Sequence, residues 1–262
     1  MAVGKSVPRQ KLTYLRDLLR ELVVRDMKLR YKRSFLGIAW SLLNPLFQLV
    51  VLVFLFQRAL RLDIPNYVSF AFTGVLAYDW FQSGLFLATV CITDGRDLIK
   101  RPGFPAAILP VATVTTSMIH FLLALPVLLL FVLIDVGRLT AAIAVLPVVI
   151  ALEFLLILGL AYLTAALQVT FRDTQHLLGI LLRLLFFLTP VFYDASVIPE
   201  AYQALYRLNP MAQLITAYRT ILLEGQLPSF FSLLMLGVLS TGLLWSGYAV
   251  FQRASNRFVE EL

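Results

Sequence analysis

Three charged residues stand alone inside long apolar runs of the sequence: Asp79, Glu153 and Arg183. A charged side chain is costly inside a membrane, so such residues usually line a pathway or bind a polar partner. At 1.5 Å per helical residue, the predicted depths of Glu153 and Arg183 differ by ~12 Å, which is too far for an ion pair within one chain. Each is therefore expected to face protein or water, either as a functional group or as a plain structural contact.

The sequence predicts no nucleotide site and no metal site on this chain. Val3–Ser6 reads VGKS, the tail of a phosphate-binding loop, but the first glycine of that pattern would fall before residue 1 and no strand precedes it. His120 and His176 stand apart, and Cys91 is the single cysteine, so no residues have metal-ligand spacing. We expect no cofactor here, and we expect nucleotide to bind a partner chain.

Two short charged loops are candidates for contact with such a partner. The first, DGRDLIKRPGFP, places the apolar pair Leu98–Ile99 among charges, which suits a cleft on another protein. The second, FRDTQH, begins at Phe171. A plain solvated loop is the alternative for either. The candidate contact residues are Asp97, Leu98, Ile99, Lys100, Arg101, Arg172 and Asp173.

The composition places these residues in a polytopic membrane protein. Of 262 residues, 60% are hydrophobic and only 14% are charged, with a mean hydropathy of +0.85. Soluble domains are nearer half apolar and a quarter charged. A spanning helix needs ~20 apolar residues, and the sequence predicts an all-α fold with six spans. These are Ser34–Gln57, Gly74–Thr93, a span from near Val111 to Ile134 after a proline-rich elbow, Thr140–Thr170, Leu177–Tyr193 and Pro228–Gln252.

The distribution of basic residues predicts the orientation. Sixteen of the 22 Lys and Arg residues fall on the side that holds both termini, and five fall on the other. Cytoplasmic loops are the ones enriched in Lys and Arg. Both termini are therefore expected in the cytoplasm. The chain reads as one domain, residues 1–262, with a six-span region at 34–252 and a cytoplasmic tail at 253–262.

Residues 1–33 are expected to hold an amphipathic helix in the cytoplasmic interface. Apolar residues recur at spacings of three and four from Leu12 to Met27, while Arg16, Arg20 and Arg25 fall mostly on other faces. A mere topology anchor is the alternative. A helix from Gln10 to Tyr31 would run ~30 Å, which is longer than anchoring requires.

The segment Phe186–Gly225 is too polar to cross a bilayer and too apolar for an ordinary loop. Asn209 followed by Pro210 predicts a helix start, and Gly225 predicts its end. With a shorter helix from Pro199, this predicts an external re-entrant hairpin between spans five and six. Turns at membrane depth persist only under protein or beside water. A loop lying on the surface is the alternative.

Five stretches together resemble the membrane subunit of ATP-binding-cassette exporters for polysaccharides of the O-antigen, capsule or teichoic-acid type. In order, they are RYKRSFLGIAWSLLNPL, DLIKRPGFPAAILP, FRDTQH, LTPVFYDASVIPE and LNPMAQLITAYRTILLEG. The resemblance implies a homodimeric permease in the bacterial cytoplasmic membrane, with two copies of a separate ATPase subunit that bind ATP and magnesium. It implies a lipid-linked polysaccharide as substrate and no nucleic acid.

The same resemblance implies roles for individual residues. The N-terminal helix and the two loops would touch the ATPase, and the hairpin would gate the exit. Arg25 and Arg30 would pass a phosphorylated head group to Arg183, because a guanidinium binds phosphate with two parallel hydrogen bonds. Aromatic rings would stack on sugars along a conduit, an interfacial aromatic belt being the alternative. The conduit and gate residues are then Trp40, Tyr78, Trp80, Phe81, Arg183, Phe187, Tyr193, Tyr202 and Tyr218.

Three other functions compete with this interpretation. A drug or small-molecule exporter permease would typically have a large external domain or another gate segment. A membrane-embedded glycosyl- or acyltransferase would need a catalytic acid or histidine cluster at one interface, and we find none in the sequence. A non-enzymatic scaffold would not need charges within its spans.

Overall fold

The computed structural model describes residues 7–32, 34, 36–60 and 63–258, and within these ranges the regular structure is entirely helical. The long helices are α1 (Val7–Tyr31), α2 (Trp40–Leu52, continued by a π-helical segment to Ala59), α3 (Tyr67–Asp94), α5 (Ile108–Val136), α6 (Leu146–Thr170), α7 (Thr174–Leu188) and α10 (Phe230–Ser255). The short helices are α4 (Arg96–Ile99), α8 (Glu200–Leu208) and α9 (Pro210–Arg219), the last continued by a π-helical turn to Glu224.

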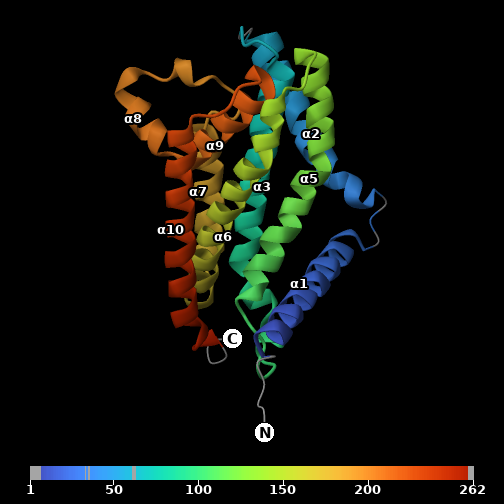
Figure 1. Cartoon of the computed structure of the whole chain (residues 1–262), viewed down its shortest axis with the longest axis vertical. Helices are drawn as coiled ribbons and strands as arrows, with labels where there is room; N and C mark the ends of the chain where they lie inside the picture. The colour runs from blue at the N-terminus through green and yellow to red at the C-terminus, as the bar shows by residue number, and fades with distance from the viewer. Residues whose placement is uncertain (1–6, 33, 35, 61–62, 259–262) are drawn as a thin grey trace.

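The helix α3 is the centre of the bundle (Figure 1). It packs against α5, α6, α7 and α9, and it is buried along most of its length. Its sequence explains this position, because apolar and small residues lie on every side of the helix and leave only Asp79 and a few neighbours for an exposed strip. A helix that is apolar all round belongs inside a bundle.

Among the described residues, five helices are long and apolar enough to cross a membrane: Trp40–Ala59, Tyr67–Asp94, Ile108–Val136, Ala141–Thr170 and Phe230–Ser255. They match five of the six predicted spans. The predicted fifth span is represented by α7, whose 15 residues reach about 22 Å. It ends five residues before the predicted limit of Tyr193, because Thr189 is extended and Pro190 follows it.

The start of α3 differs from the sequence-based expectation. The second span was predicted to begin at Gly74. Tyr67–Thr73 instead forms the first two turns of α3, after Asn66 in the left-handed conformation. Asp79 therefore lies about 18 Å along the helix rather than near its outer end.

Close approach of α6 and α10 depends on two glycines. A Cβ at Gly159 would meet the backbone of Leu243 and Leu244, and a Cβ at Gly247 would collide with the carbonyl oxygen of Gly159. Small residues allow helix backbones to touch in this way inside membranes. These two helices form the most extensive helix pair in the fold.

The predicted N-terminal helix is present as α1, and it runs obliquely beside α5 (Figure 1). Leu22 and Val23 are buried, and Leu15, Leu18, Leu19 and Met27 pack against the core, whereas Leu12 stays exposed. At its end, the hydroxyl of Tyr31 lies 3.0 Å from Nδ1 of His120 on α5. The helix is thus attached to the bundle along most of its apolar face.

Candidate functional site

The segment between α7 and α10 contains the two helices that the sequence predicted. The side chain of Asn209 accepts hydrogen bonds from the backbone N–H groups of Met211 and Ala212, Pro210 is the first residue of α9, and Gly225 ends the helix with φ 68°. In Figure 1, α8 projects to the side of the bundle, while α9 lies among the other helices. The local prediction of helix start and stop is confirmed.

Upstream of α8, Asp194 begins a short turn, Ala195–Val197, by accepting a hydrogen bond of 2.8 Å from the backbone N–H of Ser196. Hydrogen bonds from Ser196 lower the pKa of Asp194 below its usual value. The carboxylate is thereby held in its charged form at the exposed end of the segment.

The helix α9 is buried on nearly every side. Leu214, Ile215, Tyr218, Ile221 and Leu222, which lie on one side of the helix, are all buried. So are Met211, Ala212 and Ala217 on other faces, because α9 contacts α3, α6 and α10 together. This helix is part of the core, whereas Tyr202 and Leu208 in α8 are exposed.

A buried arginine fixes α9 to α3 and to the turn that follows α7. Arg219 is 8% exposed, and its Nη1 and Nη2 atoms donate hydrogen bonds of 2.8 Å to the carbonyl oxygens of Pro190 and Val191. Nε and Nη2 also donate to the carbonyl oxygen of Phe70, whose ring lies 3.4 Å below the guanidinium carbon. The planar donor set of arginine suits several carbonyls at once.

The residue before Arg219 fixes α9 to a third helix. The Tyr218 hydroxyl donates a hydrogen bond of 2.7 Å to Oε2 of Glu153 on α6. Glu153 is fully buried, and its Oε1 has no hydrogen-bond partner among the described residues. Glu153 therefore pairs with α9 and not with Arg183, in agreement with the predicted difference in depth.

Gly74 is the position where the turn after α7 meets α3. A Cβ there would collide with the carbonyl oxygen of Val191 and would lie 2.9 Å from Nη2 of Arg219. Nearby, Tyr67 donates to the carbonyl oxygen of Phe192, and Asn209 donates to the Thr189 hydroxyl. Hydrogen bonds from Tyr67 of α3, and from Asn209 and Arg219 at the two ends of α9, thus hold the turn at residues 189–192 in place.

Sequence reasoning missed Arg219, which is one of the five Lys and Arg residues predicted on the side opposite the termini. The available signal was its spacing, because Arg219 lies four residues after the apolar Ile215 and so shares that side of the helix. That spacing was outweighed by the expectation that a charge in a segment between spans meets water.

Arg183 lies on an exposed, otherwise apolar face of α7. No described residue forms a hydrogen bond or ion pair with its guanidinium, and Ile180, Leu184 and Phe187 on the same side are at least 56% exposed. An apolar face with a cation in its middle is unsuited to lipid alone. The role predicted for Arg183 stays a prediction.

The predicted conduit aromatics divide into two sets. Tyr78, Trp80, Phe81 and Tyr218 are 1–3% exposed and have no surface for a sugar in this structure. Tyr78 instead donates to the carbonyl oxygen of Leu182 on α7, and the rings of Trp80 and Phe121 stack at 4.9 Å. Trp40, Phe187 and Tyr202 are exposed, and Tyr193 is half-buried.

The two predicted contact loops lie at the same end of the bundle. The two apolar residues of the first loop, Leu98 and Ile99, differ in their exposure. Ile99 is 7% exposed and packs in the core, while Leu98 is half-buried beside the exposed Asp97, Lys100 and Arg101. Only Leu98 is therefore available as an apolar contact. Arg172 and Asp173 are both exposed.

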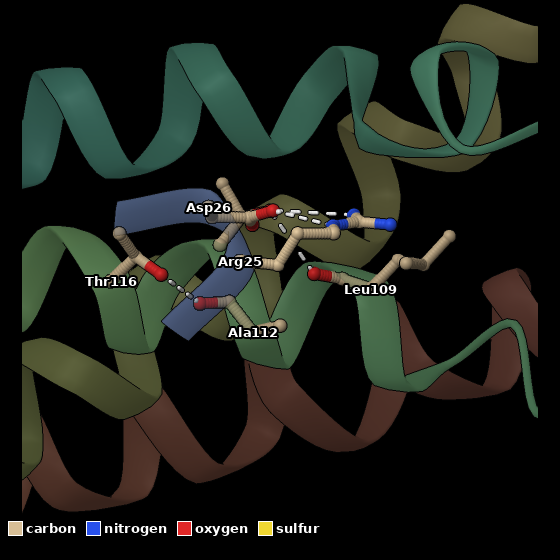
Figure 2. A network of polar contacts seen from close by, with 6 residues as sticks. Arg25, Asp26, Leu109, Ala112 and Thr116 are labelled. Carbon is tan, nitrogen blue, oxygen red and sulfur yellow. Dashed lines mark hydrogen bonds and ion pairs between the residues drawn. The ribbon is translucent and has the colours of Figure 1, made fainter. Parts of the chain in front are cut away.

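Arg25 and Arg30, the predicted head-group residues, lie on α1 and line one cavity of about 380 Å³ between α1, α3 and α5. Figure 2 shows the part of this site around Arg25 and Asp26. Within the described ranges, no three His, Cys, Asp or Glu residues gather closely enough to hold a metal ion.

Apolar helices of spanning length, packed into one bundle with a buried polar anchor, define a polytopic α-helical membrane protein. The chain belongs to the ABC-2 type transporter family, whose model matches residues 17–223.

Curated relatives are similar over nearly the whole chain. An O-antigen export system permease protein, RfbA of Myxococcus xanthus, is 38% identical over 97% of this chain and 98% of its own. The protein of the same name from Klebsiella pneumoniae is 30% identical over 97% and 98%. The polysialic acid transport protein KpsM of Escherichia coli is 23% identical over 88% and 91%.

Proposed function

We propose that this chain is the permease subunit of an ATP-driven exporter that moves a lipid-linked, O-antigen-like polysaccharide outwards across the bacterial cytoplasmic membrane. The observation that carries the proposal is the 38% identity to an O-antigen export permease over 97% of this chain and 98% of that relative.

The proposed working unit is two copies of this chain with two copies of an ATPase subunit. The exposed face of α7 supports the second copy, because Arg183 stands among exposed apolar side chains that would otherwise meet lipid. In a dimer, that face would border a polar path between the subunits. The exposed aromatic residues Trp40, Phe187 and Tyr202 are then the remaining candidates for contact with sugars.

The proposed topology has six crossings with both termini in the cytoplasm. The start of α1 and the end of α10 lie at one end of the bundle (Figure 1), which favours an even number of crossings. The chain returns from the end of α6 to the start of α10 through α7 and the hairpin, so these together supply the sixth crossing. The burial of α9 supports a hairpin that re-enters the outer leaflet.

The cytoplasmic end would contact the ATPase through the polar face of α1 and the loops around Leu98 and Arg172. A hollow of about 1040 Å³ follows that face of α1, lined by charged residues of both signs. Such a mixed surface suits a protein partner of complementary charge.

The test is export in the parent bacterium. Deleting the gene for this chain should leave lipid-linked polysaccharide inside the cell, where lectin or antibody added to intact cells cannot reach it, and plasmid-borne wild type should restore surface labelling. Unchanged surface labelling with altered drug resistance would favour the small-molecule exporter instead. Cysteines introduced at Glu200 and Arg253 into a chain lacking Cys91 test the topology: only the first should react in intact cells.

A further inference from the structure

A small polar cavity lies near the middle of the bundle, between α3, α5 and the start of α2. It leaves about 20 Å³ for the centre of a water molecule to occupy. Asp79 lies about 18 Å along α3 from its first residue, and His120 lies equally far along α5. The polar residues that line the cavity are Ser41, Asp79, Trp80, Ser83, Ser117 and His120.

Two buried polar atoms of this lining have no hydrogen-bond partner among the described residues. One is Nε1 of Trp80, whose side chain is 2% exposed, and the other is Nε2 of His120. Buried polar atoms are normally paired with protein or with ordered water. Nδ1 of His120 lies 3.0 Å from the hydroxyl of Tyr31 on α1. Nε2 is therefore the ring nitrogen that remains for a partner inside the cavity.

The serine hydroxyls of the cavity are placed to accept hydrogen bonds. Ser117 donates its proton to the carbonyl oxygen of Val114 at 2.9 Å, and Ser83 donates to the carbonyl oxygen of Trp80 at 3.4 Å. Each hydroxyl oxygen retains the capacity to accept, whereas the indole N–H of Trp80 can only donate. A ligand that fits must therefore accept a hydrogen bond from the indole and donate one to an oxygen.

The charges around the cavity argue against an ion as the occupant. The Asp79 carboxylate lines the cavity and would repel an anion. A cation would meet the indole N–H of Trp80. Moreover, Arg30 on α1 already supplies positive charge that acts on Asp79 and His120. A small neutral ligand remains, and one water molecule fits, because it needs about 10–15 Å³ when space is measured in this way.

We propose that this cavity binds a single water molecule, which joins Trp80 on α3 to His120 on α5. The water accepts a hydrogen bond from Nε1 of Trp80 and donates one to a serine oxygen or to the carboxylate of Asp79. It can donate to Nε2 of His120 or accept from it, so it fits either tautomer that the contact with Tyr31 imposes. These contacts supply the two to four polar partners that a buried water requires.

The bound water extends the attachment of α1 into the core of the bundle. Tyr31 is the last residue of α1, and its ring meets that of His120 edge to face at 5.6 Å. The other nitrogen of the same imidazole continues through the water to Trp80, which stacks on Phe121. A chain of hydrogen bonds then runs from the end of α1 to the middle of α3. This site does not depend on what the chain transports.

The direct test is a cryo-electron microscopy map of the full transporter in nanodiscs, at a resolution that shows ordered water. We expect one solvent peak within about 3.2 Å of both Nε1 of Trp80 and Nε2 of His120. Tyr31→Phe should keep the peak, because it removes only the contact at Nδ1. Ala124→Val adds two methyl groups at a buried lining residue and should displace the water. A wild-type map without this peak would overturn the proposal.

A vibrational measurement reports on the same hydrogen bond without a map. The sequence has three tryptophans, and Trp40 and Trp245 are exposed. Replacing these two with phenylalanine leaves Trp80 as the single indole of the full permease chain, which is studied in nanodiscs without the ATPase subunit. Ultraviolet resonance Raman spectra contain an indole mode that shifts to lower wavenumber when Nε1–H donates a hydrogen bond.

We expect the hydrogen-bonded position of this mode in the single-tryptophan chain and in its Tyr31→Phe derivative. Asp79→Ala should also keep it, whereas Ala124→Val should shift the mode to the position of a free indole. A free indole in the parent chain would overturn the proposal. Loss of the bonded position in Asp79→Ala would also overturn it, because the partner of the indole would then be the carboxylate itself. A bonded indole without a solvent peak in the map would assign Nε1 to a side chain, with the same consequence.

Discussion

The hydroxyl of Tyr218 on α9 donates a 2.7 Å hydrogen bond to Glu153 in the first half of α6, and both side chains are almost fully buried. The next residue, Arg219, hydrogen-bonds to backbone carbonyls of α3 and of the turn after α7. Two consecutive residues thus anchor α9 on different sides. If the hairpin gates export, we expect the exposed α8 to move more readily than α9.

The first prediction concerns the Tyr218–Glu153 contact. Tyr218→Phe leaves a buried carboxyl without its donor, which costs about 1–3 kcal/mol of folding free energy. Replacing both partners, as in Glu153→Met with Tyr218→Phe, removes the orphaned group and should recover part of the loss. Thermal unfolding of the purified complex in detergent gives the ranking. A double variant less stable than Tyr218→Phe would contradict the contact as described.

The second prediction concerns Arg219. Arg219→Met leaves the carbonyl groups of Pro190 and Val191 without donors, at about 1–3 kcal/mol each. Arg219→Lys retains the charge but not the planar fork, so its stability should lie between those of wild type and Arg219→Met. Limited proteolysis of residues 190–208, with thermal unfolding, measures the loss of docking. Arg138→Met, at an exposed arginine, is the control, and equal behaviour of the two methionine variants would refute the anchor.

The sequence predicted those features of the fold that depend on contacts between residues close together in the chain. Asn209, Pro210 and Gly225 mark the limits of a helix through contacts made within a few residues, so their types suffice. The apolar spacing of α1 and the long uncharged runs are equally local, and they predicted the helices well.

The burial of individual side chains depends on which helices pack against one another, and a single sequence does not specify this packing. Arg219 was assigned to water because its carbonyl partners at Phe70, Pro190 and Val191 come from distant elements. Trp80 was proposed for the conduit as a large aromatic residue, but packing against Phe121 buries it. From the sequence, Ile99 was expected to be as accessible as Leu98, but in the fold it is buried and faces residues of α1 and α10.

The third prediction separates Leu98 from Ile99 in contact with the ATPase. Leu98→Asp should leave the permease folded but reduce co-purification of the ATPase subunit severalfold, because it places a carboxylate on the half-buried apolar contact. Ile99→Asp should reduce the yield of folded permease instead, since it buries a charge. Leu139→Asp, at an exposed leucine beyond the other end of α5, is the control. Normal co-purification and transport in Leu98→Asp would exclude this loop from coupling.

The last prediction concerns Arg183, which forms no hydrogen bond or ion pair with any described residue of its own subunit. Its replacement should therefore leave the stability of the subunit nearly unchanged, so that a loss of function reports on what Arg183 meets in the assembly. If that group is a phosphate at the lipid linkage, Arg183→Gln should abolish substrate-stimulated ATP hydrolysis by the reconstituted complex. Arg183→Lys should retain part of the stimulation, because it keeps the charge while losing the bidentate geometry.

The control for Arg183 is Arg138→Gln, which removes an exposed arginine beyond the other end of the bundle. Basal ATP hydrolysis and thermal unfolding should be the same in all variants, so that only the response to added substrate distinguishes them. Full substrate stimulation of ATP hydrolysis in Arg183→Gln, at unchanged expression, would contradict phosphate binding by Arg183. The side chain would then only extend to the membrane surface, as long cationic side chains do. Loss of stimulation in both Gln and Lys variants would point instead to a contact with the second subunit that requires the planar guanidinium.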